Sequence, residues 1–263
     1  MIELHDVALD VGGHPLLSRL SARIGAGEFV AVIGPNGVGK TTLLRSLAGL
    51  HRHAGGAMLL DGVAIDAMSA LERARRIAFV TADDVMLDAL AVRDVVAIGR
   101  FPHHRWWQWR SREDDEAAVE RALASVGMDD FSERLFATLS SGERQRVWIA
   151  LGLAQETPIV LLDEPTSHLD LRVAHEILSL LRGLASSGKV VVCALHDINE
   201  AAAYADRIAL LGDGTLLAIE FPETLLDDAR LDAVYGIAME RIRLPGGGLR
   251  IYARQGRKLR GSA

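Results

Sequence analysis

The sequence has almost no cysteine, no segment that resembles a signal peptide and no long apolar run. A single cysteine among 263 residues excludes a disulfide within the chain. Cys193 lies in the apolar run VVVCAL, which favours a small core residue over a reactive thiol. The first ten residues, MIELHDVALD, have no basic flank followed by an apolar core, and no run approaches the ~18 residues of a membrane span. We therefore expect a cytosolic protein, and docking on a membrane protein stays open.

Positive charge is also not in excess. The formal net charge of −6 gives no general affinity for nucleic acid. Only the C-terminal stretch, residues 236–263, is basic. We favour a solvated basic tail, and contact with anionic lipid or nucleic acid is the alternative. The basic residues of this stretch are Arg241, Arg243, Arg250, Arg254, Arg257, Lys258 and Arg260.

Short apolar runs alternate with helical patterns along most of the chain. EFVAVI at residues 28–33 and KVVVCALH at residues 189–196 are typical of buried strands, whereas TTLLRSLAGL at residues 41–50 has the pattern of a helix. Such alternation predicts an α/β core with a largely parallel sheet. Mainly helical patterns at residues 83–158 interrupt it, and we interpret them as a helical insertion. A hairpin is expected around Gly212-Asp213-Gly214.

The stretch GPNGVGKTT, residues 34–42, has the spacing of a phosphate-binding loop between a strand and a helix. Its glycines allow a tight bend, and the backbone N–H groups of such a loop turn inward on phosphate oxygens. In this pattern Lys40 reaches the terminal phosphates and the Thr41 hydroxyl binds Mg²⁺. The sequence therefore predicts a nucleotide site. The residues expected to bind the nucleotide are Gly34, Pro35, Asn36, Gly37, Gly39, Lys40, Thr41 and Thr42.

Two carboxylates follow the apolar run IVLL at residues 159–162. We expect Asp163 to hold Mg²⁺ through water, and Glu164 to orient and polarise the attacking water. Acidic residues at strand ends are also common as caps. The motif therefore indicates hydrolysis only because a phosphate-binding loop accompanies it.

His196 directly follows the apolar run VVVCAL and precedes Asp197. Ligands of parallel sheets lie at the carboxyl ends of strands, so we expect His196 to reach the γ-phosphate. A helix cap formed by Asp197 is the competing explanation for this local pattern. The expected catalytic residues are thus Glu164, His196 and Lys40.

In their order and spacing, these residues resemble the nucleotide-binding subunits of ATP-binding cassette (ABC) transporters, over about residues 1–235. GPNGVGKTT resembles Walker A, IVLLDE resembles Walker B, SHLD resembles the D-loop, and LSSGE resembles the family signature. The resemblance implies an α/β P-loop NTPase (RecA-like) core, residues 1–82 and 159–235, with an N-terminal antiparallel β portion. It also implies an inserted helical subdomain at residues 83–158, with ATP and Mg²⁺ as ligands.

The stretch LSSGERQR, residues 139–146, is a second place where backbone N–H groups favour an anion. In the family that the chain resembles, two subunits pair head to tail, and the signature of one closes over ATP held by the Walker A of the other. The resemblance therefore implies that Ser140 and Gly142 serve the γ-phosphate of a second copy. Asp170 of the D-loop is included among the expected nucleotide-binding residues.

The stretches GRFPHH and LAQETP narrow the resemblance to importers of iron–siderophores, haem and cobalamin, with the iron–siderophore group most similar. Such a subunit couples ATP-driven dimerisation to uptake of an iron chelate. Its implied partners are transmembrane permease subunits and, indirectly, a substrate-binding protein. Its implied location is peripheral, on the cytoplasmic side of the inner membrane. Interleaved aromatic and basic residues at 100–110 also suit nucleic acid, but we favour an exposed loop that packs on the helical region.

Two positions depart from the family pattern around the nucleotide. Ala82 stands where the family has a glutamine that helps complete the Mg²⁺ shell, and Asp83 or Asp84 could substitute through water. Val11 stands where an aromatic residue stacks on adenine, and loss of a stack costs ~1 kcal/mol or more. These departures predict hydrolysis that is retained but slow.

The signature departs as well, because Ser141 and Glu143 replace a glycine and a glutamine. A negative Glu143 near ATP is unfavourable unless it points away, and it can also favour the helix start. The altered FVTADD and LSSGE stretches motivate an alternative, a degenerate cassette that pairs with an active one. A soluble ABC ATPase acting on nucleic acid or ribosomes is a further alternative, although such proteins often carry two cassettes or a long coiled-coil insertion.

Overall fold

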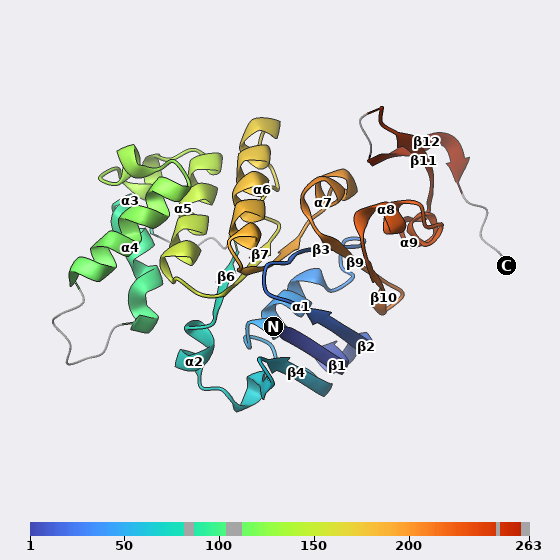
Figure 1. The fold of residues 1–263 in the computed structure, drawn as a ribbon, viewed down its shortest axis with the longest axis horizontal. Helices are drawn as coiled ribbons and strands as arrows, with labels where there is room; N and C mark the ends of the chain where they lie inside the picture. Colours follow the sequence, from blue (N-terminus) through green and yellow to red (C-terminus); the bar gives the residue numbers. More distant parts are fainter. Residues whose placement is uncertain (82–86, 104–111, 246–247, 259–263) are drawn as a thin grey trace.

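A six-stranded sheet in the order β10-β9-β3-β8-β7-β6 forms the centre of the protein (Figure 1). This computed structural model describes residues 1–81, 87–103, 112–245 and 248–258. Strands β9, β3, β8, β7 and β6 run parallel, and β10 pairs antiparallel with β9. The predicted parallel core and the predicted hairpin around Gly212-Asp213-Gly214 are confirmed. The bounds are β3 Phe29–Ile33, β6 Ile77–Val80, β7 Ile159–Asp163, β8 Val190–Ala194, β9 Arg207–Gly212 and β10 Thr215–Glu220.

Strand β3 lies between two hydrophobic cores. Phe29, Ala31 and Ile33 belong to the core that contains α6, whereas Val30 and Val32 belong to the core that contains α1. All five residues are buried because both faces of the sheet are covered, which explains the unbroken apolar run in the sequence. The two helices are α1 Lys40–Leu47 and α6 Leu171–Ser186.

A second, antiparallel sheet in the order β2-β1-β4-β5 covers α1 on the side away from the central sheet (Figure 1). Leu9 and Leu20 of this sheet share a core with Leu44 of α1. The N-terminal antiparallel portion that the family resemblance implies is therefore present. Its strands are β1 Ile2–Val11, β2 His14–Ile24, β4 Gly55–Leu60 and β5 Val63–Ala64, and the short helix α2, Ala70–Ala74, follows them.

Three helices stand together at the left of Figure 1, beyond the end of the sheet at β6. Buried Arg100 fixes this group: its Nε donates to Asp115 Oδ1 at 2.8 Å, and its Nη1 donates to Ala154 O at 2.7 Å and Glu156 Oε2 at 2.8 Å. Arg100 belongs to the GRFPHH stretch, and its last two acceptors, Ala154 and Glu156, both belong to LAQETP. The helices are α3 Val92–Ala97, α4 Arg112–Ser125 and α5 Ser141–Ala154. None of the helices in the described ranges is long and apolar enough to cross a bilayer.

The C-terminal stretch differs from the expected solvated tail. Residues 237–243 and 249–258 form a hairpin of two antiparallel strands, and Met239, Leu249 and Ile251 bury their side chains against α7, α8 and α9. For this part of the stretch the expectation was wrong, because apolar side chains are buried and two arginines pair with carboxylates near the neighbouring helices. The elements are α7 Ile198–Tyr204, α8 Pro222–Leu226, α9 Arg230–Tyr235, β11 Ile237–Arg243 and β12 Leu249–Lys258.

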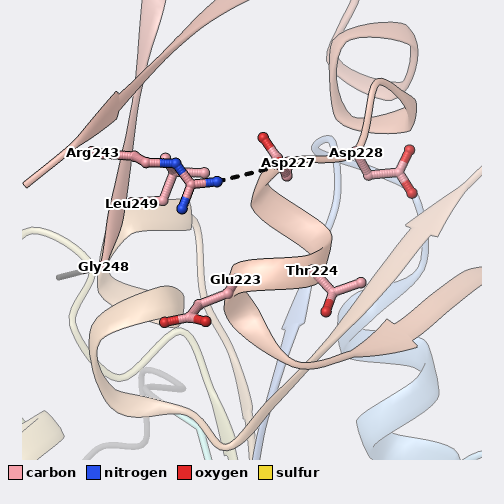
Figure 2. Close-up of a pocket in the computed structure, with 7 residues that line it drawn as sticks. All are labelled: Glu223, Thr224, Asp227, Asp228, Arg243, Gly248 and Leu249. Atoms are coloured by element: carbon pink, nitrogen blue, oxygen red, sulfur yellow. Dashed lines mark ion pairs between the residues drawn. The ribbon is translucent and has the colours of Figure 1, made fainter.

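Two arginines of β11 illustrate this neutralisation. Arg241 Nη2 lies 2.6 Å from Asp232 Oδ1 and also donates to the backbone oxygen of Asp228. Arg243 Nη2 lies 3.6 Å from Asp227 Oδ2, across a cavity of about 420 Å³ (Figure 2). Two of the positive charges that look unpaired in the sequence thus have carboxylate partners within the fold. Arg257 and Lys258 lie where no side chain is described, and Arg260 lies outside the described residues.

Candidate nucleotide-binding site

Most of the predicted site residues lie where β3, β8 and β7 end. A cavity of about 860 Å³ lies at this edge. The three strands are neighbours and run parallel, so the segments that follow them emerge side by side. The cavity is lined by Val11, Leu16, Asn36, Gly37, Gly39, Lys40, Thr41, Thr42, Glu164, Thr166, Ser167, His168, His196, Asp197 and Glu200.

Two glycines of the loop after β3 have backbone conformations and surroundings that would strain any residue with a Cβ. Gly34 has φ 152°, and a Cβ there would lie 2.5 Å from the backbone oxygen of Leu211. Gly39 caps α1 with φ 110°, and a Cβ there would lie 2.9 Å from Leu17 Cδ1. The loop therefore packs tightly on β9 and β2 while its other side lines the cavity. This is the arrangement that a phosphate cradle needs.

Lys40 is buried within this loop. Its ammonium donates to the backbone oxygens of Gly34 at 2.9 Å and Pro35 at 3.3 Å. Burial lowers the pKa of Lys40, and the carboxylates of Glu164 and Asp163 oppose that shift. The side chain is thus held over the loop, where a phosphate oxygen can replace the two carbonyl acceptors.

Asp163 ends β7 and faces α1. Its Oδ1 atom is buried and has no hydrogen-bond partner among the described residues. Burial raises the pKa of Asp163, the hydrogen bond with Thr41 opposes this shift, and the charge of Glu164 adds to it. A buried carboxylate oxygen without a partner, next to a threonine hydroxyl, fits the small set of protein ligands that Mg²⁺ takes beside phosphates and water.

Glu164 and His196 lie in direct contact. His196 Nε2 is 2.6 Å from Glu164 Oε2, and the Ser167 hydroxyl donates to the same oxygen at 3.5 Å. Glu164 has φ 52°, and its N–H donates to the backbone oxygen of Ala194 at 3.2 Å. This turn directs the carboxylate from the end of β7 towards the segment that follows β8.

Asp197 caps α7, as the competing explanation of the local pattern required. Its Oδ1 accepts from the N–H groups of Asn199 at 2.6 Å and Glu200 at 3.2 Å. The cap and the position of His196 are compatible, because one fixes the helix start and the other faces the cavity.

Sequence reasoning missed Glu200 and Thr166, which also line the cavity. Thr166 Oγ1 donates to Glu200 Oε2 at 3.1 Å, and burial raises the pKa of Glu200. The available signal was spacing, since Glu200 follows the N-cap Asp197 by three residues and so lies in the first turn of the helix that begins just after β8.

Ser140 and Gly142 do not line this cavity. Ser140 is the N-cap of α5, and its backbone N–H and hydroxyl both donate to Glu143 Oε2 at 2.8 Å. The bond from the backbone N–H, followed by that from the hydroxyl, lowers the pKa of Glu143. Glu143 thus serves the helix start, as expected. Asp170 likewise caps α6, accepting from the Val173 N–H at 3.0 Å.

The departures from the family pattern have different outcomes. Val11 lines the cavity and is half exposed, and its place beside the adenine stays a prediction. Ala82, Asp83 and Asp84 lie outside the described residues.

The strand order, the glycine loop and the carboxylates at the strand ends define a P-loop nucleotide hydrolase with an ATP-binding cassette fold. The profile of the ABC transporter family matches residues 17–167. The chain belongs to this family.

Three comparisons bear on the place of the chain within the family. The ferric enterobactin transport ATP-binding protein FepC of Escherichia coli strain K12 is 38% identical over 232 residues, which cover 88% of this chain and 85% of the relative. An inward-facing ABC transporter of metal-chelate type is 27% identical with a TM-score of 0.83, over 96% of this chain and 97% of that one. The dimeric structure of the bacterial ABC cassette MJ0796 is 30% identical with a TM-score of 0.76, over 84% and 99%.

Proposed function

We propose that the chain is the ATP-hydrolysing subunit of an importer for an iron–siderophore or a similar iron chelate. The observation that carries the proposal is that the glycine loop, Glu164 and His196 line one cavity, and that Asp163 is hydrogen-bonded to Thr41 of the same cavity. The relative that transports ferric enterobactin and the metal-chelate type transporter support the substrate class.

Each residue at the cavity takes a separate role in this proposal. The N–H groups of residues 34–42 and the Lys40 ammonium bind the phosphates. Thr41 and Asp163 hold Mg²⁺, which when bound neutralises charge on the phosphate oxygens. Glu164 orients the attacking water and accepts its proton, and His196 donates a hydrogen bond to the γ-phosphate.

The site of one chain is incomplete in this proposal. Ser140 and Gly142 lie at the start of α5, outside the cavity, and α5 stands apart from α1 in Figure 1. A second copy in head-to-tail orientation supplies them to the bound ATP, together with Asp170. The dimeric relative supports such an arrangement. Nucleotide that binds only the paired state stabilises it by mass action, and hydrolysis removes that stabilisation.

The helical region meets the transporter's membrane-embedded part in this scheme. We propose that residues 83–158 act as a subdomain that contacts the permease, while residues 1–82 and 159–235 form the nucleotide-binding core. The subunit then lies peripherally on the cytoplasmic side of the inner membrane. A substrate-binding protein acts with it indirectly, through the permease.

The decisive experiment measures ATP hydrolysis and association together. We expect Mg²⁺-dependent hydrolysis by the wild-type chain, and a Glu164→Gln variant that binds ATP, hydrolyses it at least ~100-fold more slowly and forms a dimer. Glu240→Gln removes an exposed carboxylate of β11 and is the matched control. A Glu164→Gln variant that stays monomeric in saturating MgATP contradicts the shared site.

The substrate class needs its own measurement. Co-expression with the permease that co-purifies, followed by reconstitution in vesicles with candidate binding proteins, should give hydrolysis that an iron–siderophore complex stimulates. Stimulation by haem or cobalamin alone would contradict the iron–siderophore assignment and leave the ATPase role in place.

A further inference from the structure

The segment after His196 is attached to the C-terminal hairpin by hydrogen bonds at Asn199. Asn199 Nδ2 donates to the backbone oxygen of Ile251 at 3.0 Å, and the Ile251 N–H donates to Asn199 Oδ1 at 2.9 Å. Arg250 Nη1 adds a bond to the backbone oxygen of Asn199 at 3.1 Å. The amide therefore satisfies the N–H and C=O of one residue of β12, as a neighbouring strand would.

Both ends of this connection are held in place. Asn199 lies in the first turn of α7, where Asp197 accepts its backbone N–H at 2.6 Å. Ile251 is buried, at 6% exposure, in the same hydrophobic core as Met239. Two hydrogen bonds hold the Asn199 side chain to the backbone of Ile251, and the capped first turn of α7 holds its own backbone. The side chain therefore has little freedom to move.

Open space lies beside His196 on the side of the hairpin. A cavity of about 390 Å³ is lined there by His196, Asn199, Tyr235, Met239 and Ile251, together with other residues of α7 and the hairpin. Because this cavity is open, side-chain packing on that side does not prevent the imidazole of His196 from turning away from Glu164. The bonds through Asn199 fix the backbone from which His196 reaches Glu164.

We propose that Asn199 is a positioning residue for hydrolysis, because it holds the His196 segment against Glu164 by linking α7 to β12. The inference rests on the proposed ATPase function and extends it to the C-terminal hairpin. Through Ile251, strand β12 thereby contributes to setting the turnover rate, although it lies away from the phosphate loop.

The test separates turnover from nucleotide binding in the full-length chain. Asn199→Leu removes both side-chain bonds, and we expect kcat for MgATP to fall about tenfold, a change worth roughly 1.4 kcal/mol. The Kd for ATP should change less than about twofold, because the phosphate loop and Val11 are untouched. Asn199→Asp keeps an acceptor for the Ile251 N–H, so we expect a smaller loss, about threefold.

The matched control is Arg243→Gln, which alters the hairpin at the ion pair in Figure 2 and should keep the wild-type kcat. Equal kcat values for wild type and Asn199→Leu overturn the inference, and so does a parallel loss of ATP affinity and kcat. If Asn199→Leu does not fold, the Asp variant decides by the same two measurements. A wild-type chain without hydrolysis instead overturns the proposed function.

Discussion

His196 Nε2 lies 2.6 Å from Glu164 Oε2, between segments that follow the adjacent parallel strands β8 and β7. The imidazole and the carboxylate are therefore in direct contact at the edge of the cavity. In the proposed reaction the same two groups must face the γ-phosphate and the attacking water. The contact keeps both side chains at the edge of the cavity, where bonds to ATP and to the attacking water can replace it.

We expect His196→Ala to lower kcat by about 100-fold or more while ATP still binds. The reason is loss of a group at the γ-phosphate without change to the glycine loop. Rapid-quench hydrolysis and equilibrium ATP binding measure the two effects. His175→Ala removes an exposed histidine of α6 and should stay within about twofold of wild type. Loss of ATP binding in His196→Ala would instead indicate a structural role.

Two glycine-to-alanine variants should have opposite effects on the unfolding free energy. At Gly34 a Cβ meets the Leu211 oxygen at 2.5 Å, so we expect Gly34→Ala to destabilise the fold and to abolish ATP binding. Gly183 lies within α6 with nothing within 4 Å of its Cβ position, so Gly183→Ala should stabilise by about 0.5–1 kcal/mol. Urea unfolding measures both, and a stable, ATP-binding Gly34→Ala variant would contradict the tight packing.

Asp163→Asn should raise the melting temperature of the nucleotide-free protein near neutral pH and eliminate Mg²⁺-dependent hydrolysis. Burial raises the pKa of Asp163 above its unfolded value of 3.8, so the native state binds more protons there than the unfolded state. This carboxylate therefore lowers the unfolding free energy as pH rises through the raised pKa. The advantage of Asn should shrink as pH falls below that pKa. Thermal unfolding from acid to neutral pH tests this, and an equal melting temperature at every pH would exclude it.

Glu143→Gln should strengthen ATP-driven dimerisation at little cost in stability. Glutamine can keep the capping box with Ser140, while the negative charge that would face a second copy's phosphates is removed. The pKa of Glu143 is lowered, so its ionised form stabilises the native state above the unfolded pKa, and that contribution is lost as pH falls through the folded pKa. We expect the variant to lose at most ~1 kcal/mol at neutral pH. Sedimentation of the Glu164→Gln and the Glu143→Gln/Glu164→Gln variants at graded ATP measures the dimer, and weaker association of the double variant would refute the expectation.

The sequence predicts well those parts of the site that depend on neighbouring residues. The run FVAVI is buried on both faces and precedes a loop whose glycines have no room for a Cβ, so strand and loop are both recognisable locally. Asp163, Glu164 and His196 end apolar runs, and a parallel sheet brings such ends together.

The parts that escaped prediction depend on contacts between distant segments. Arg241 and Arg243 look like a solvated basic run until Asp232 and Asp227 pair with them. The link from Asn199 to Ile251 joins residues 52 positions apart, and nothing in either local pattern indicates it. Burial of the hairpin follows from these tertiary contacts rather than from composition.

The hairpin also affects how the protein should be produced for experiment. A fragment that stops at residue 235, at the end of α9, would leave Asn199 without its acceptor on β12 and would uncover apolar side chains of α7, α8 and α9. Such a fragment could bind nucleotide and yet turn over slowly. Turnover rates for this cassette should therefore come from chains that keep the last two strands intact.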